Sequence, residues 1–222
     1  IGIASPGGIR NDRATVSQSP NFPGWKNENL KAGLTERGLS GVVVENDANA
    51  AAFGENRRGA GKSADDMAMF TLGTGVGGGL VLNRRIWRGA WGMGGELGHI
   101  TVDPNGPICG CGNRGCLEAF VKSEAICRMG RALLAQRRAP ILSEMTKGDY
   151  GKITPKKIFE AARQGDEDCA TLYRKAGEYI GIVVADLVNV LNLPLFVIGG
   201  GVSGAFELME PGIVDQVRRR AF

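Results

Sequence analysis

The sequence predicts an α/β fold, and three segments carry that prediction. The apolar run GVVVEN at residues 41–46 is typical of a buried parallel strand, and a helix-forming segment begins directly after it at Asp47. Residues 195–203, LFVIGGGVS, indicate a strand that leads through a glycine turn into a helix. Apolar residues recur at helical spacing from Asp166 to Leu191, which predicts a long helix with one buried face. Strands that alternate with helices are typical of α/β proteins.

The remaining elements follow from local patterns. Further strands are expected at residues 1–5, 67–73, 77–83 and 85–88, and the two at 67–73 and 77–83 are expected to be antiparallel. A turn is expected at residues 6–12. Further helices are expected at residues 27–37 and 123–137, from Thr154 with Pro155 at its first position, and at residues 212–222.

Composition is that of a globular protein and argues against several classes. The 222 residues allow one large domain or two smaller ones, and 43% apolar and 23% charged residues are ordinary. A net charge of +4 is too weak to indicate nucleic-acid binding. Polar residues and Pro194 interrupt the most apolar stretch, residues 179–202, so no membrane span is predicted. Five cysteines do not suit a closed disulfide framework and favour the cytoplasm; Cys127 and Cys169 are expected to be core residues.

The only histidine and three cysteines are clustered with the spacing His99-x9-Cys109-x-Cys111-x4-Cys116. Three thiolates and an imidazole form a standard tetrahedral zinc site, and the glycines of this segment allow the thiols to converge. Disulfides or unrelated buried thiols are the alternatives, but a disulfide would leave one cysteine unpaired. Because four protein ligands close the coordination sphere, such a zinc ion would be structural rather than catalytic.

Two glutamates flank this cluster. Glu96 lies three residues before His99, and Glu118 lies two residues after Cys116. A metal-held loop that fixes two carboxylates is suited to holding a polyhydroxylated ligand. The alternative is that both glutamates are solvated surface groups.

The 35 glycines fall in clusters, which predicts tight loops beside ligands. Gly73-x-Gly75-x-x-Gly78 matches the dinucleotide-binding pattern, but that pattern requires a following helix, and a strand is predicted instead. The amides of this turn and the Thr74 hydroxyl can approach phosphate oxygens, although a plain glycine hairpin fits as well. The glycines at 199–201 lie between a strand and a helix, where a nucleotide can lie against the backbone.

Asn46 and Asp47 lie where a predicted buried strand meets a helix. One interpretation is that Asp47 is the N-cap of that helix. The other is that Asp47 is a general base, because ligands bind at the carboxyl ends of parallel strands in α/β folds. Its carboxylate could accept a proton from an alcohol that attacks phosphorus, and Asn46 could bind hydroxyls of the same sugar.

The order of these motifs resembles one family, the ROK group of repressors, open reading frames and kinases. The motifs extend over most of the chain and are IGIASPGG, VENDANAAAFGE, LGTGVGGGLVL, GGELGH, CGCGNRGCLE and FVIGGGVS. The segment GELGHITVDPNGPICGCGNRGCLE is most similar to the bacterial glucokinases of this group. The resemblance implies an α/β, actin-like ATPase fold of the hexokinase and ribonuclease H type. Residues 1–45 would be the remainder of a small N-terminal lobe, and residues 46–222 a large C-terminal lobe with the zinc loop 99–116.

The resemblance also implies ATP-dependent phosphorylation of a hexose, glucose to glucose 6-phosphate, with ATP, Mg²⁺ and a structural zinc ion as cofactors. Asp47 is the implied catalytic base. The implied sugar-binding residues are Gly7, Gly8, Asn46, Asp47, Glu96, His99 and Glu118. The implied ATP-binding residues are Gly73, Thr74, Gly75, Gly200 and Gly201. The implied zinc ligands are His99, Cys109, Cys111 and Cys116, and the second ring nitrogen of His99 would face the sugar.

Some expectations stay open at this point. The family's D-x-G-G-T phosphate loop does not precede Ile1, and the chain stops within a predicted helix at Phe222, so we expect a piece of a longer protein with little kinase activity of its own. The alternatives are a kinase for N-acetylmannosamine or fructose, a sugar-responsive ROK repressor, and a zinc-stabilised sugar-binding module. Resemblance to the family implies a homodimer or homotetramer, no membrane partner, and no nucleic acid unless a DNA-binding domain precedes the chain.

Overall fold

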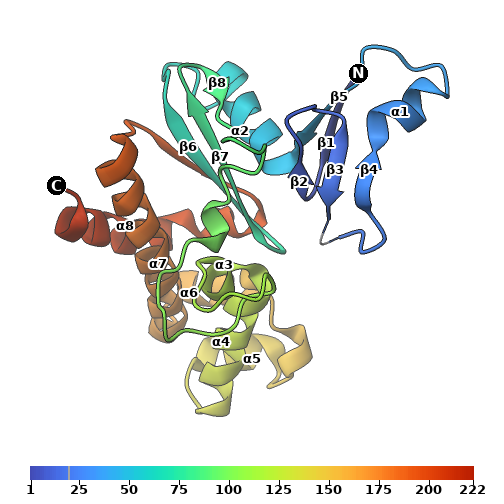
Figure 1. Cartoon of the computed structure of the whole chain (residues 1–222). Coiled ribbons are helices and arrows are strands. Elements are labelled where there is room, and N and C mark those ends of the chain that lie inside the picture. The colour runs from blue at the N-terminus through green and yellow to red at the C-terminus, as the bar shows by residue number, and fades with distance from the viewer. Residues whose placement is uncertain (20) are drawn as a thin grey trace. The chain divides into compact units, whose positions relative to one another are not determined.

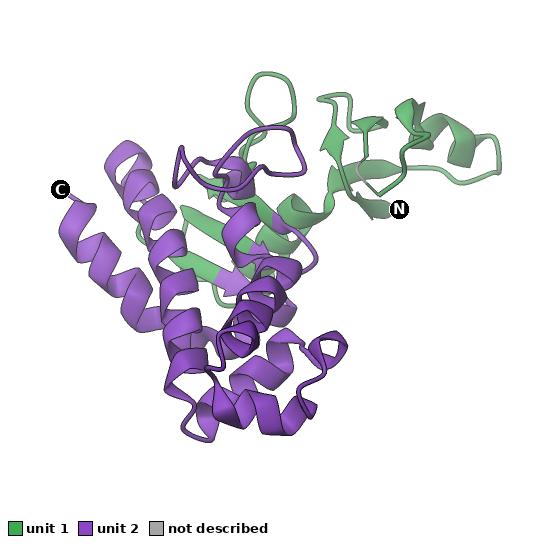
Figure 2. Cartoon of the chain, turned by 90° about the horizontal axis from the view of Figure 1, so that it is seen from below, with its two compact units in different colours: residues 1–70, 77–96, 194–197 green, residues 71–76, 97–193, 198–222 purple. Residues whose placement is uncertain are grey.

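The structure is a computed structural model that describes residues 1–19 and 21–222 (Figure 1). The chain divides into two compact units, each assembled from segments far apart in the sequence (Figure 2). Unit 1 comprises residues 1–70, 77–96 and 194–197, and unit 2 comprises residues 71–76, 97–193 and 198–222. The predicted lobes, divided after residue 45, stay a prediction.

Unit 1 contains a parallel pair of strands, β1 (Gly2–Ser5) and β5 (Val43–Asn46), in which Ile3 is paired with Val44. Val44 belongs to a small core that is completed by Ile9, Val16 and Val42. The helix α2 (Asp47–Arg58) begins at the residue after β5. The predicted parallel strand and the helix that follows it are therefore confirmed.

A second sheet of unit 1 has the order β2-β3-β4, with both pairs antiparallel. Its strands are β2 (Gly8–Ile9), β3 (Thr15–Gln18) and β4 (Lys26–Asn29), and the short helix α1 (Leu30–Thr35) follows. The expected helix at 27–37 is thus wrong over its first three residues, because Asn29 ends a strand and caps α1 by accepting a hydrogen bond from Ala32 N at 2.8 Å. The expected turn at 6–12 contains β2, and β3 was not predicted, since Thr-Val-Ser-Gln is too short and polar to indicate a strand.

The third sheet has the order β8-β7-β6-β9. Its strands are β6 (Met67–Leu72), β7 (Val76–Leu82), β8 (Arg85–Ile86) and β9 (Phe196–Gly199), as the sequence patterns predicted. Met67, Phe70 and Leu72 of β6 are fully buried. The turn between β6 and β7 consists of residues 73–75, so the glycine segment joins two strands and not a strand and a helix.

Unit 2 is mainly helical. Its elements are η1 (Leu97–His99), α3 (Glu118–Val121), α4 (Ser123–Ala135), α5 (Pro140–Thr146), η2 (Tyr150–Lys152), α6 (Pro155–Arg163), α7 (Glu167–Leu191), η3 (Gly201–Ala205) and α8 (Phe206–Arg220). The predicted helices at 123–137, from Pro155 and at 166–191 are confirmed. The short helix α5 was not predicted. Its first turn is held by Asp166, the buried N-cap of α7, which accepts hydrogen bonds from Ile141 N at 3.0 Å and from Leu142 N at 3.2 Å.

Helices α7 and α8 pack closely because glycine removes side chains from their contact. A Cβ on Gly177 would overlap the carbonyl oxygen of Met209, and one on Gly212 would overlap the carbonyl oxygen of Arg174. Cys127 and Cys169 are buried in unit 2, as expected for core cysteines.

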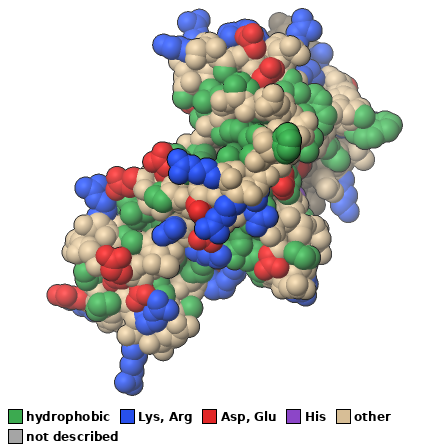
Figure 3. Space-filling view, turned by 90° about the vertical axis from the view of Figure 1, so that its left-hand side faces the viewer, with side chains coloured by type: hydrophobic (Ala, Val, Ile, Leu, Met, Phe, Trp, Pro, Cys, Tyr) green, Lys and Arg blue, Asp and Glu red, His purple; other side chains and the backbone are tan. Residues whose placement is uncertain are grey.

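The surface mixes both signs of charge. On the face drawn in Figure 3, Lys and Arg side chains lie interspersed with Asp and Glu side chains. Within residues 1–19 and 21–222, every helix is too short or too polar to span a lipid bilayer.

Candidate functional site

The junction of β5 and α2 in unit 1 presents the predicted carboxylate. Asn46, in extended conformation, is the N-cap of α2: its Oδ1 accepts a hydrogen bond from Asn49 N at 3.0 Å. The Asn46 Nδ2 donates to the carbonyl oxygen of Gly7 at 3.1 Å. The interpretation of Asp47 as the N-cap is therefore wrong. Asp47 is the first helical residue, it is exposed, and its Oδ1 accepts from Ala48 N at 2.9 Å.

A buried ion pair supports this junction, and the sequence analysis missed it. Glu45 is 8% exposed, and its Oε2 accepts hydrogen bonds from Arg88 Nε at 2.9 Å and from Arg88 Nη2. Its Oε1 accepts from Asn46 N at 3.2 Å and from Asn49 Nδ2 at 3.4 Å. The sequence contained one signal for this pair: Glu45 directly follows the apolar residues of GVVVEN. A carboxylate in a buried strand requires a charged partner.

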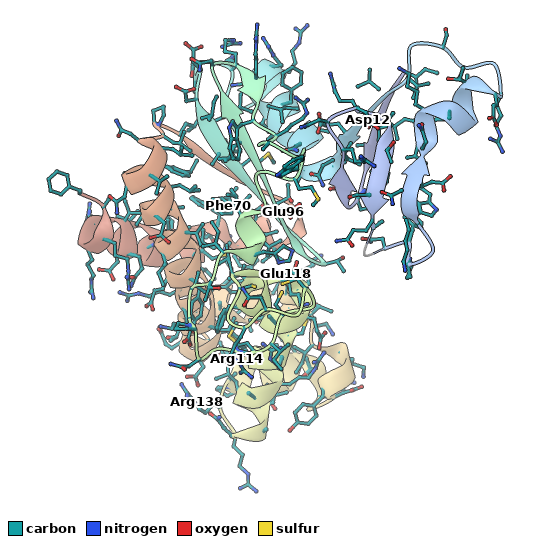
Figure 4. The ribbon with its side chains drawn as sticks, viewed as in Figure 1. Asp12, Phe70, Glu96, Arg114, Glu118 and Arg138 are labelled. Carbon is teal, nitrogen blue, oxygen red and sulfur yellow. The ribbon has the colours of Figure 1, made fainter. Side chains whose placement is uncertain are left out.

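The two glycines assigned to the sugar pocket lie in the same unit. Gly7 has φ +104°, and a Cβ there would overlap the carbonyl oxygen of Gln18. Only glycine adopts this conformation without strain, so the close approach of residue 7 to Gln18 requires glycine. A Cβ on Gly8 would lie 2.7 Å from Ser17 Oγ. Glu96 is the last residue of unit 1 before η1 (Figure 4).

In unit 2, the predicted metal ligands converge. One ligand atom from each of His99, Cys109, Cys111 and Cys116 lies within 4.8 Å of all the others. The Cys109 Sγ is 3.8 Å from His99 Nδ1, and the Cys111 and Cys116 Sγ atoms are 3.7 Å apart. The edge of a zinc tetrahedron with zinc–sulfur bonds of 2.3 Å is about 3.8 Å, so these separations match a metal site and are too long for a disulfide bond.

The loop that carries the thiols has little regular structure. Two isolated bridges hold it, Thr101 with Cys116 and Ile108 with Arg114. The Arg114 Nη1 donates to the carbonyl oxygen of Gly106 at 2.8 Å (Figure 4). Gly115 has φ +72°, and any side chain there would overlap the carbonyl oxygen of Asp103.

The thiols differ in their ease of deprotonation. Burial raises the pKa of Cys116 to about 12, and it also raises the pKa of Cys109. A hydrogen bond from the Asn113 backbone lowers the pKa of Cys111. Without a cation, two buried thiols therefore keep their protons, whereas a bound metal would displace them and compensate three thiolates.

Glu118 lies between this cluster and the glycine turn. Its Oε2 accepts a hydrogen bond from Val76 N at 3.0 Å. Its Oε1 lies 3.6 Å from Cys109 Sγ and 3.9 Å from Lys122 Nζ. The side chain is 15% exposed, and Figure 4 shows it at the start of α3.

The two glycine loops are neighbours within unit 2. In the first, Gly73 N donates to Gly75 O at 2.9 Å, which forms a tight turn with Thr74 exposed at its tip. Gly200, with φ +92°, lies against Leu72, the residue before that turn: a Cβ there would overlap the Leu72 carbonyl oxygen. Gly201 begins η3 directly after it.

The structure thus groups the predicted site residues into two sets. Unit 1 holds Gly7, Gly8, Asn46, Asp47 and Glu96, and unit 2 holds Gly73, Thr74, Gly75, His99, Cys109, Cys111, Cys116, Glu118, Gly200 and Gly201. Within unit 1 the Asn46 amide joins Gly7, and within unit 2 Glu118 joins the thiol cluster to the glycine turn.

Comparison with known proteins gives the family. The description "ROK family" matches residues 1–222. The chain is 40% identical to a glucokinase of Thermotoga maritima over 98% of its own length and 68% of the relative's, and 33% identical to a xylose repressor of Caldicellulosiruptor bescii over 100% and 55%. A ROK glucokinase of Streptomyces griseus, solved with glucose and AMPPNP, is 42% identical with a TM-score of 0.86, covering 98% of this chain and 70% of that one. This likeness confirms the predicted actin-like ATPase fold. The chain belongs to the ROK family.

Proposed function

We propose that the chain is the main part of an ATP-dependent hexose kinase that converts glucose to glucose 6-phosphate. The observation that carries the proposal is the exposed Asp47 carboxylate, which follows β5 directly. Asn46 caps the helix that Asp47 begins, and the Glu45–Arg88 ion pair supports the end of β5. The similarity to a glucokinase solved with glucose and an ATP analogue supports the same substrates. The chain spans 68% of the Thermotoga maritima relative, so the proposal concerns the protein that contains it.

In this proposal, Asp47 accepts the proton of the sugar's primary hydroxyl while its oxygen attacks the terminal phosphorus of ATP. The sugar's other hydroxyls are bound by Asn46, Glu96, His99 and Glu118, with the backbone of Gly7 and Gly8 nearby. Residues Gly73, Thr74 and Gly75 contact the phosphates, and Gly200 and Gly201 lie along the nucleoside. Mg²⁺, when bound, compensates charge on the phosphates.

The four-residue cluster fits a structural zinc ion. His99, Cys109, Cys111 and Cys116 would hold it, and four protein ligands leave no open position for chemistry. Because His99 approaches the cluster through Nδ1, its Nε2 is left to bind a sugar hydroxyl. The same loop carries Glu118, so the ion would orient two sugar-binding residues at once.

Two other functions remain candidates. A kinase for another hexose, such as N-acetylmannosamine or fructose, would use the same hydroxyl-binding residues. A sugar-responsive repressor is favoured by the similarity to the xylose repressor. A cytoplasmic location and a homodimer or homotetramer are also part of our proposal.

The test is ATP-dependent phosphorylation by the natural polypeptide that contains this chain. Glucose, N-acetylmannosamine, mannose and fructose would be compared, with sugar binding measured by calorimetry in parallel. We expect the highest kcat/KM with glucose. A higher kcat/KM with a different hexose would show that glucose is not the substrate. Tight sugar binding without turnover would contradict the kinase proposal and favour a sugar-binding or repressor function.

A further inference from the structure

We propose that Glu118 and Ser123 are positioning residues that tie the cysteine loop to the glycine turn, so that metal binding sets the geometry of the phosphate-binding backbone. The inference rests on the proposed function in one respect, namely that residues 73–75 contact ATP phosphates. Its mechanical part, the link between cluster and turn, does not depend on that function. All the residues involved belong to unit 2.

The first link is the Glu118 carboxylate, whose two oxygens go to two different segments. Oε2 accepts from Val76 N at 3.0 Å, where the turn enters β7. Oε1 lies 3.6 Å from the Cys109 Sγ, which can donate only as a thiol. With a metal bound, Glu118 is tied to the cluster through the backbone, because it begins α3 two residues after Cys116. The carboxylate lies close to the turn at a residue without a side chain: a Cβ on Gly75 would lie 2.8 Å from Oε2.

The second link is Ser123, the first residue of α4. Its backbone N and its Oγ both donate to the carbonyl oxygen of Gly73, each at 2.8 Å. Gly73 is the first residue after β6. Ser123 therefore holds one end of the turn and Glu118 holds the other, and the two lie only five residues apart across α3.

The third link is steric. Gly98 is buried beside His99, and a Cβ on Gly98 would overlap the carbonyl oxygen of Val76. All three supports lie close in sequence to a predicted metal ligand. Gly98 directly precedes His99, and Glu118 follows Cys116 by two residues. Ser123 comes after the short helix α3, which Glu118 begins.

A metal that fixes the four ligands would therefore also fix the partners of Gly73 O and Val76 N. A ligand contact made by backbone amides depends on their orientation, so a loosened turn binds phosphate less well. Couplings between two sites are typically about 5- to 150-fold in affinity, and they are reciprocal. ATP should then strengthen metal binding by the same factor by which the metal strengthens ATP binding.

The test measures two quantities in the natural protein that contains this chain. The first is the hydrogen-exchange rate of the Val76 amide in zinc-loaded, chelated and reloaded protein. The second is the dissociation constant for AMPPNP in the same three states. We expect exchange at Val76 to rise on chelation, AMPPNP affinity to fall by about 10-fold, within the usual range of couplings, and both to return on reloading.

A variant keeps the inference testable if chelation unfolds the loop. In zinc-loaded protein, Ser123→Ala removes one of the two hydrogen bonds to Gly73 O and should weaken AMPPNP binding about 3- to 10-fold. Metal content and glucose affinity should stay unchanged. Ser143→Ala, in the half-buried Ser143 of α5, is the matched control and should alter none of these values.

The outcomes separate the two proposals. Unchanged Val76 exchange after verified metal loss, or unchanged AMPPNP affinity in Ser123→Ala, would overturn the link and leave the kinase proposal standing. A zinc-loaded protein that does not bind AMPPNP at all would overturn the nucleotide role of the turn, while the Val76 exchange result would still decide whether the metal loop holds the turn.

Discussion

The β5–α2 junction and the cysteine loop place their functional groups by different means. At the junction, Asp47 follows a hydrogen-bonded parallel strand and opens a 12-residue helix that its neighbour Asn46 caps. The preceding residue, Glu45, is paired with Arg88 from a distant segment of unit 1. In the loop, residues 100–117 have only isolated bridges, and Cys109 and Cys116 form a small core cluster with Ala119. Regular secondary structure fixes the first group, whereas the second has little regular structure and would be fixed by the metal that we propose.

This difference predicts how each region responds to damage. The junction should lose stability gradually as single contacts are removed, because several separate hydrogen bonds stabilise it. The loop should respond in an all-or-none manner, because a metal site that loses one ligand loses most of its affinity. The following changes test that contrast, beginning with the largest expected effect.

Cys111→Ser should abolish stoichiometric zinc binding and increase amide exchange across residues 100–117. We expect zinc affinity to fall by more than about 100-fold, because even groups outside the ligand set change metal affinity by 10- to 100-fold. Metal content by mass spectrometry and exchange of the Asn49 amide at the junction are the measurements. Cys127→Ala, which removes a buried cysteine outside the cluster, is the control and should retain the metal. If Cys111→Ser retained one zinc ion per chain, the cluster would not be the site.

Glu45→Ala should destabilise unit 1 without releasing the metal. The change leaves the Arg88 guanidinium without its carboxylate partner. The side chain of Glu45 is 10% exposed and the side chain of Arg88 is 25% exposed. Removing one partner of a buried pair costs up to 5 kcal/mol, and partial exposure of the arginine reduces this to about 2–3 kcal/mol in the free energy of unfolding.

Urea denaturation checks that value. Glu124→Ala, in the exposed pair with Arg131, is the matched control and should cost clearly less than Glu45→Ala, because solvent screens an exposed pair. Equal losses in the two variants would show that the Glu45 pair does not support the junction.

Asn46→Ala should have the smallest effect, a loss of about 1 kcal/mol from the N-cap of α2. Asn46→Ser keeps a capping oxygen but removes the amide that donates to Gly7 O. Thermal unfolding of the two variants separates the cap from the Gly7 contact. A serine variant as unstable as the alanine variant would assign the effect to the Gly7 contact instead.

The sequence was sufficient where residues have strong local preferences or strict spacing. The apolar run before Asp47 and the period of α7 predicted elements that the structure has, and the spacing from His99 to Cys116 predicted side chains that converge. The polar strands β3 and β4 lacked such a signal, since the Lys26–Asn29 strand is exposed at every residue and is formed only by pairing with β3.

Contacts between segments that are distant in the sequence could not be predicted either. Nothing local connects Glu45 with Arg88, which is 43 residues later, or Ser123 with Gly73, which is 50 residues earlier. The Asp47 cap was misassigned because Asn46 and Asp47 are both good N-cap residues, and only the backbone angles distinguish them.

The most direct test of the central claim is Asp47→Asn in the natural protein that contains this chain, with kcat and the glucose dissociation constant both measured. Glu167→Gln is the matched control, because Glu167 is likewise an exposed acid at the first position of a helix. The account predicts that Asp47→Asn lowers kcat by about 10²- to 10⁴-fold, with glucose affinity nearly unchanged. Near-normal turnover in Asp47→Asn would contradict it.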